Sequence, residues 1–183
     1  MPNIFKIALW TTLVSFIFGS LLTLSYYQTS KDELLFIGYA YTALAVLVNL
    51  IILIMVIGHA IRNKSQRKKG FLVTMIQLAN VPVVVIYFIF IMNLLSVMRI
   101  QLINPSPTEM TDIYIEGCEE KQVEKLSPGE SKTVWVHING DCSISMKYNT
   151  AGLSKEETIM GYCSANMGKK IKYRIGEKND LVF

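Results

Sequence analysis

Charged residues are missing from three long stretches of this sequence. No Asp, Glu, Lys or Arg occurs in residues 7–30, 34–61 or 70–98. Each stretch holds the roughly 20 apolar residues that a helix needs to cross the hydrocarbon core of a bilayer. We therefore predict a membrane α-helical bundle of three transmembrane helices, which are Ile7 to about Tyr26, Leu34–Ile61 and Phe71–Met98. Proton relays and ion pathways usually need ionisable groups at membrane depth, so the pattern argues against a pump or an ion-coupled transporter.

Motifs of catalysis and metal binding are also missing. The chain has two histidines and three cysteines, and it contains no C-x-x-C, H-E-x-x-H or G-x-S-x-G sequence. A blue-copper site needs two histidines with a cysteine, but His137 is the only histidine after residue 98. A nucleophile pair of His137 with Cys142 or Cys163 is formally available, although a disulfide or a buried cysteine is the more ordinary use of these residues. We therefore expect no enzymatic activity, no metal and no cofactor.

Positive charge is concentrated between the second and third apolar stretches, and few acidic residues balance it. Only Asp32 and Glu33 are acidic before residue 99. Basic residues beside a membrane span resist translocation, so this loop should stay in the cytoplasm. The N-terminus should then be cytoplasmic and the region after residue 98 extracytoplasmic. The residues that set this topology are Arg62, Lys64, Arg67, Lys68 and Lys69.

Several spans followed by a disulfide-permissive outer region fit a multi-pass protein of a bacterial inner membrane, while a eukaryotic membrane stays open. A basic loop between two spans is explained by topology, so we expect contact with the lipid bilayer and no nucleic-acid partner. A cleaved signal peptide is the alternative reading of the first stretch. The apolar run exceeds the 7 to 15 residues expected of one, and no A-x-A-like cleavage site follows it.

The second and third spans contain four amide side chains: Asn49, Gln77, Asn80 and Asn93. Asn49 and Asn80 lie at similar distances from the basic loop, so we expect them to hydrogen-bond across the bundle. Pro82 should kink the third helix, because proline lacks the backbone donor that a helix needs. The alternative use of these amides is a polar pathway in a small transporter or channel subunit.

A different pattern begins after the third span. Residues 99–111 contain Pro105 and Pro107 and are predicted to form an extended linker. Residues 112–183 alternate apolar and polar positions in short runs, which predicts a small all-β domain, an antiparallel sandwich or barrel of six or seven strands. Ser127–Glu130 should form a turn between two strands. The predicted strands include Gln122–Leu126, Lys132–Ile138, the alternating set Ile144, Met146 and Tyr148, Ile159–Tyr162, the set Ile171, Tyr173 and Ile175, and a final Leu181–Phe183.

All three cysteines, Cys118, Cys142 and Cys163, fall in this domain. A domain of this size has a thin core, and an oxidising compartment would allow a disulfide. A hairpin centred on Pro128 and Gly129 would bring Cys118 near Cys142, whereas a hairpin around Ala151–Ser154 would bring Cys142 near Cys163. We favour the pair of Cys118 and Cys142, and the other pairing stays open. The remaining thiol is expected to be buried.

Two surface features of the β-domain are candidates for binding. If Val134 and Val136 face the core, Trp135 and His137 face outward, and an exposed Trp is a common anchor at protein interfaces. By the same alternation, Lys170, Lys172 and Arg174 form a basic stripe, although such a stripe is more often only a solvated sheet face. We predict an integral membrane protein whose extracytoplasmic domain binds a protein partner without catalysis, as an accessory subunit or an immunity-type protein would. Assembly into an oligomer stays open.

Overall fold

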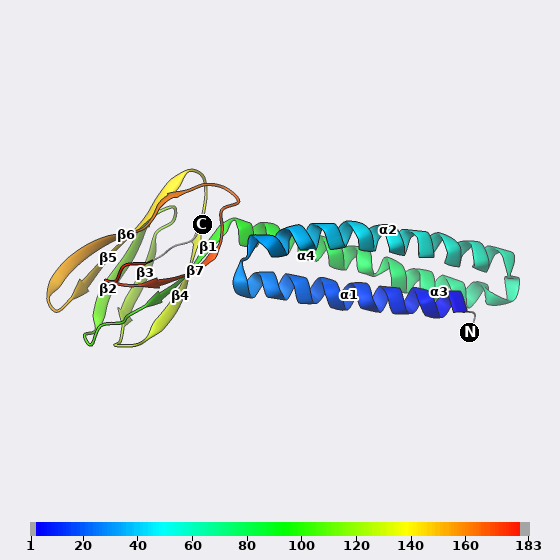
Figure 1. The fold of residues 1–183 in the computed structure, drawn as a ribbon, viewed down its shortest axis with the longest axis horizontal. Helices are drawn as coiled ribbons and strands as arrows, with labels where there is room; N and C mark the ends of the chain where they lie inside the picture. Colours follow the sequence, from blue (N-terminus) through cyan, green and yellow to red (C-terminus); the bar gives the residue numbers. More distant parts are fainter. Residues whose placement is uncertain (1–2, 180–183) are drawn as a thin grey trace. The chain divides into compact units, whose positions relative to one another are not determined.

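The computed structural model describes residues 3–179 of the chain and divides into two compact units, Met1–Ile91 and Met92–Phe183. The first unit is helical, and the second contains all of the β-strands (Figure 1). The predicted strand at Leu181–Phe183 lies outside the described residues. Together the units confirm the predicted fold class, a bundle of three long apolar helices followed by a β-domain.

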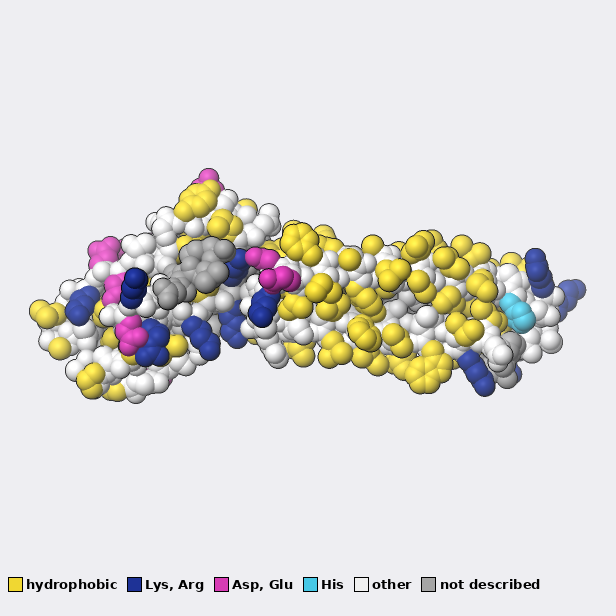
Figure 2. Space-filling model, viewed as in Figure 1, with side chains coloured by type: hydrophobic (Ala, Val, Ile, Leu, Met, Phe, Trp, Pro, Cys, Tyr) yellow, Lys and Arg dark blue, Asp and Glu magenta, His cyan; other side chains and the backbone are white. Residues whose placement is uncertain are grey.

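The helices follow the three uncharged stretches. Each is long and apolar enough to cross a membrane, with mean hydropathy between 1.9 and 2.7 over its most apolar window. Hydrophobic side chains cover the visible face of the helices in Figure 2. The third apolar helix, Lys64–Leu95, is built from three consecutive segments. The elements are α1 (Asn3–Thr29), α2 (Asp32–Arg62), η1 (Lys64–Gln66), α3 (Arg67–Leu78) and α4 (Asn80–Leu95).

The ends and interruptions of the helices have local causes. At the end of α1, Ser30 adopts a positive φ of 51° and its amide donates to the carbonyl of Tyr26, which closes the helix in a left-handed cap. The acidic Asp32 and Glu33 in the first turn of α2 favour the positive end of its dipole. Between α3 and α4 the helical pattern is interrupted at Ala79, because Pro82 has no amide hydrogen for the carbonyl of Leu78.

Small residues allow the helices to approach one another closely. Gly70 of α3 faces Ala60 of α2, where a Cβ on the glycine would lie 2.5 Å from the alanine Cβ. In α1, Gly19 faces the ring of Tyr87 in α4. The buried cluster beside Gly70 contains Phe5, Ala8, Val56 and Val73. These contacts pack the bundle internally.

The β-domain consists of two sheets. The strand order is β4-β1-β7 in the smaller sheet and β3-β2-β5-β6 in the larger one. All neighbouring strands are antiparallel except β1 and β7, which run parallel. The strands are β1 (Val97–Ile103), β2 (Met110–Gly117), β3 (Lys121–Leu126), β4 (Ser131–His137), β5 (Cys142–Thr150), β6 (Leu153–Cys163) and β7 (Lys170–Arg174).

The predicted linker over residues 99–111 is wrong in both its ends. Val97–Ile103 is the central strand β1 of the smaller sheet, and Met110 already begins β2. The residues between them form a tight, ordered connection. Asn104 is fully buried, and its amide donates to the carbonyls of Thr108 and Leu126 while its oxygen accepts from the amide of Ser106. A polar, proline-containing segment is therefore fixed by one buried side chain.

The turn at Ser127–Glu130 forms, but it does not close a hairpin. Gly129 has a φ of +74°, and the amide of Glu130 donates to the carbonyl of Ser127. The flanking strands β3 and β4 belong to different sheets, so the turn carries the chain from one sheet to the other. By contrast, Ala151 and Gly152, both at positive φ, join β5 and β6 in a true two-residue hairpin.

The core lies between the two sheets. Alternate residues of each strand point into it, as the period-two pattern predicts. Its members from the smaller sheet are Met98, Ile100, Leu102, Val134, Val136, Ile171 and Tyr173, and those from the larger sheet include Ile113, Ile115, Val123, Ile144, Met146 and Tyr148. The residues between them in sequence therefore form the outer faces.

Candidate binding site

The outer face of the smaller sheet brings together the two surface features predicted separately. On β4, Trp135 is 41% exposed while Val134 and Val136 are buried, so the predicted alternation is confirmed. On β7, Lys170 and Lys172 are exposed and alternate with buried Ile171. We call this surface, formed by the outward residues of β4, β1 and β7, the outer face.

Strand β1 supplies the register that joins these residues. Arg99 of β1 pairs with Trp135 on one side and with Lys170 on the other. The next row of the outer face contains Gln101, with Thr133 and Lys172 as its two partners. Strands in a sheet are about 4.8 Å apart, so the Trp135 and Lys170 backbones are separated by about 10 Å. Arg99 is only 2% exposed and Gln101 is half-buried, so the exposed residues of the outer face come from β4 and β7. The sequence pattern did not indicate either residue, because both fall in the predicted linker.

Glu119, in the turn between β2 and β3, holds His137 at the end of β4. The Glu119 carboxylate accepts hydrogen bonds from the backbone amide of His137 at 2.7 Å and from its Nδ1 at 3.0 Å. Lys121 forms an ion pair with the same carboxylate at 2.8 Å. The pKa of Glu119 is lowered to about 2, mainly by the hydrogen bond from the His137 amide and next by the hydrogen bond from Lys121. His137 is therefore tied to the β2–β3 turn.

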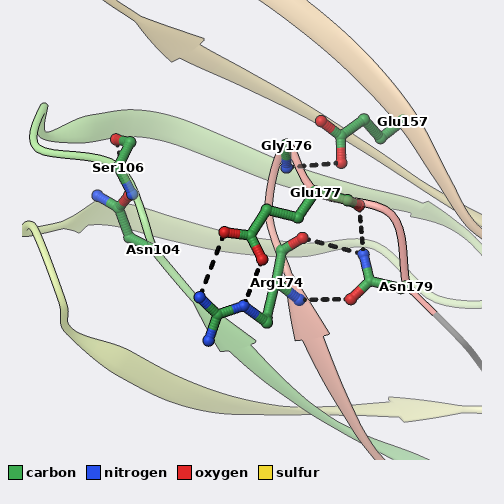
Figure 3. Close-up of polar contacts among 7 residues, drawn as sticks. All are labelled: Asn104, Ser106, Glu157, Arg174, Gly176, Glu177 and Asn179. Carbon is green, nitrogen blue, oxygen red and sulfur yellow. Dashed lines mark hydrogen bonds and ion pairs between the residues drawn. The ribbon is translucent and has the colours of Figure 1, made fainter.

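At the other end of the outer face, Arg174 is engaged within its own loop (Figure 3). Its Nε and Nη2 atoms donate to the two carboxylate oxygens of Glu177, at 2.5 and 3.2 Å. This bidentate pair raises the pKa of Arg174 and lowers that of Glu177. Asn179 closes the loop by accepting from the Arg174 amide and donating to its carbonyl. Arg174 was predicted to belong to a basic stripe, but its charge is neutralised by Glu177.

Glu157 of β6 connects the two sheets, a role that no pattern in the sequence indicates. Its carboxylate accepts from the hydroxyls of Tyr148 on β5 at 2.6 Å and Tyr173 on β7 at 2.9 Å. It also accepts from the amide of Gly176, as Figure 3 shows. Burial, and then the adjacent carboxylate, raises the pKa of both tyrosines. With three donors satisfied, Glu157 has a structural role.

The structure pairs Cys118 with Cys142 in a disulfide, with a Cα–Cα distance of 5.2 Å. The reason differs from the predicted hairpin. Cys118 follows the last residue of β2, Cys142 begins β5, and these strands are neighbours in the larger sheet. Cys142 also lies opposite Cys163 in the register of β5 and β6, so all three cysteines lie close together. The Cys163 thiol is free and buried, and burial raises its pKa.

The four amides of the helices have different environments. Asn49 Nδ2 donates to Ser15 Oγ and Asn80 Nδ2 donates to the carbonyl of Thr12, so both bond to α1 and the predicted Asn49–Asn80 bond is not formed. Asn49, Gln77 and Asn80 all line one groove between the helices. Asn93, near the end of α4, is exposed and does not line it.

The five basic residues of the predicted cytoplasmic loop lie in and beside the connection between α2 and α3. Arg62 ends α2, Lys64 begins η1, and residues 67–69 form the first turn of α3. All five side chains are exposed. Their number and exposure leave a strongly positive connection between two apolar helices.

Within residues 3–179, no group of three His, Cys, Asp or Glu side chains has an arrangement that would hold a metal ion. No protein-family model matches the chain, and comparisons with curated proteins and with solved structures found no significant match.

Proposed function

We propose that the chain is a membrane-anchored, non-catalytic binding protein whose β-domain recognises an acidic surface of a protein partner through the outer face. One observation carries the proposal: the register of β4, β1 and β7 places Trp135, Lys170 and Lys172 on the same face of one sheet. A large aromatic residue beside cations is typical of the residues that dominate protein interfaces. The cations would select for a partner of opposite charge and speed its association.

The proposed location is a bacterial inner membrane, with the N-terminus in the cytoplasm and the β-domain outside it. The exposed basic connection at residues 62–69 supports this orientation. A disulfide between Cys118 and Cys142 supports it independently, because such bonds persist mainly in oxidising compartments. A small transporter or channel subunit is the alternative. It has less support, because Asn49 and Asn80 already bond to α1.

A photocrosslinker at Thr133 tests the binding face in cells. Thr133 is exposed and lies in the row next to Trp135, so the probe would report on a bound partner without removing the aromatic anchor. We expect one crosslinked species that weakens at least about 30-fold in Trp135→Ala, as for an interface residue worth about 2 kcal/mol or more. Lys172→Glu should also weaken it.

The matched control is the same probe at Tyr162 on β6. Tyr162 is 57% exposed, more than Trp135, but it belongs to the larger sheet. Equal crosslinking from Tyr162 and Thr133, or a Thr133 crosslink that survives both substitutions, would contradict the proposed face.

A further inference from the structure

The groove between the helices contains a buried amide without a hydrogen-bonding partner. Gln77, in α3, is only 6% exposed, and neither its Nε2 nor its Oε1 atom has a partner. Asn49 contributes a third such atom, its Oδ1, because only its Nδ2 is used by Ser15 and Ala45. A buried polar atom without a partner is costly, and native proteins rarely keep several in one place without a use.

The remaining lining of the groove is mostly apolar, and its other polar residues are Ser15, Tyr41, Thr42, Asn80 and Tyr87. Its volume is about 360 Å³, within the range of pockets that hold small molecules. Leu50, Leu53 and Val81 are among the lining residues, and no Asp, Glu, Lys, Arg or His contributes to the lining. The lining includes residues on both sides of the interruption between α3 and α4, with Leu78 before it and Asn80 after it. Such a site favours a neutral, largely aliphatic ligand.

The depth of the unpartnered amide excludes ordinary phospholipid headgroups. Gln77 is ten residues from Arg67, the first residue of α3, which corresponds to about 15 Å along a helix. In a membrane with a hydrocarbon core about 30 Å thick, this position lies near the midplane. Phospholipid tails that reach this depth carry no hydrogen-bonding group.

We propose that this groove binds a neutral, lipid-soluble carboxamide. The ligand carbonyl would accept from Gln77 Nε2, and its N–H group would donate to Gln77 Oε1 or Asn49 Oδ1. A whole transmembrane helix is a poorer fit, since one turn about 10 Å wide and 5.4 Å long already occupies more than about 400 Å³. The groove and the outer face are different sites, so this proposal does not depend on the proposed function.

The probe is a diazirine-bearing decanamide, added to the full-length chain in phosphatidylcholine nanodiscs. We expect photolabelling of residues 41–53 and 77–87, which supply most of the groove lining, and competition by decanamide but not by decane. Gln77→Met keeps the length of the side chain and removes its donor and acceptor. It should reduce labelling about 3- to 10-fold, as for one or two hydrogen bonds in a membrane.

Two further variants separate recognition from misfolding. Ala45→Phe should fill the groove and also reduce labelling, whereas Asn93→Leu removes an amide outside the groove and should leave labelling unchanged. Equal labelling of wild type and Gln77→Met, or label spread evenly over the apolar helix surface, would overturn the proposal. A second copy of the chain disulfide-linked through Gln77→Cys would overturn it as well, because the groove would then be a contact between copies.

Discussion

Removing the disulfide should destabilise the β-domain by an amount that its loop length sets. Cys118 and Cys142 are separated by 24 residues. Closing a loop of this size in the unfolded chain lowers its entropy by an amount equivalent to about 3.5 kcal/mol at 25 °C. We therefore expect Cys142→Ser to lower the free energy of unfolding of the domain by about 3.5 kcal/mol, a large fraction of the stability of a small domain.

The assay is urea unfolding of the full-length chain in detergent, followed by Trp fluorescence. Trp10→Phe leaves Trp135 as the only Trp, so the signal comes from the β-domain alone. With a denaturant slope of about 1–3 kcal/mol/M, the midpoint should fall by about 1.2–3.5 M in Cys142→Ser. An unchanged midpoint would refute the stabilising role of this disulfide.

Cys118→Ser is the more demanding variant, because it leaves Cys142 opposite Cys163 in the β5–β6 ladder. We expect this variant to lose as much stability as Cys142→Ser. After unfolding without reductant, the thiols of Cys142 and Cys163 should both react. Cys163 is fully buried among core residues, and burial raises its pKa, so its reactive thiolate form is scarce. A Cys118→Ser variant with wild-type stability and no free thiols would show that Cys142 and Cys163 pair instead.

Three other perturbations test particular contacts. The folded-state pKa of Glu119 is near 2, below its ordinary value of 4.5, so its stabilising contribution is present above pH 4.5 and is lost as the pH falls toward 2. We expect the free energy of unfolding to fall by about 1–2 kcal/mol over this range after solvent screening, as measured by unfolding curves at several pH values. The Glu119→Gln variant should not show this pH-dependent loss. Asn104→Ala should cost about 2–4 kcal/mol in the same assay, because two carbonyls lose their donor. In Gly168→Ala, the new Cβ would lie about 2.5 Å from the carbonyl oxygens of Leu94 and Leu95, so a loss of about 1–3 kcal/mol is expected by thermal unfolding.

The elements that the sequence predicts well are those with a strong local signal. Three uncharged stretches predict three apolar helices, and period-two alternation predicts the inward and outward residues of β4 and β7. The signal fails where two patterns merge. Strand β1 begins at Val97, two residues after α4 ends at Leu95, so its apolar residues read as a continuation of the helix. The first half of β6 is polar and exposed, so alternation does not reveal it.

The assembly of the candidate site depends on long-range pairing. Trp135 and the cations of β7 were recognised separately as surface residues, but their common face requires β1 to lie between β4 and β7. The parallel pairing of β1 with β7 joins Arg99 to Lys170, residues far apart in sequence. No local pattern specifies such a partner, because strand alternation constrains which face a residue occupies and says nothing about the neighbouring strand. The disulfide was likewise predicted through a hairpin that the structure replaces with the β2–β5 pairing.

Orientation is the property on which the proposed function rests most heavily, and it can be tested with the native cysteines in place. Cys118 and Cys142 are joined in a disulfide and Cys163 is buried, so a membrane-impermeant maleimide should not label the folded wild-type chain. Lys178→Cys adds an exposed thiol to the β-domain, and Ser65→Cys adds one to the basic connection. Because one apolar helix separates these positions, they must lie on opposite sides of a membrane that it crosses. We expect the maleimide to label Lys178→Cys in intact spheroplasts and Ser65→Cys only after lysis; the reverse pattern would place the disulfide in a reducing compartment, where it would not persist.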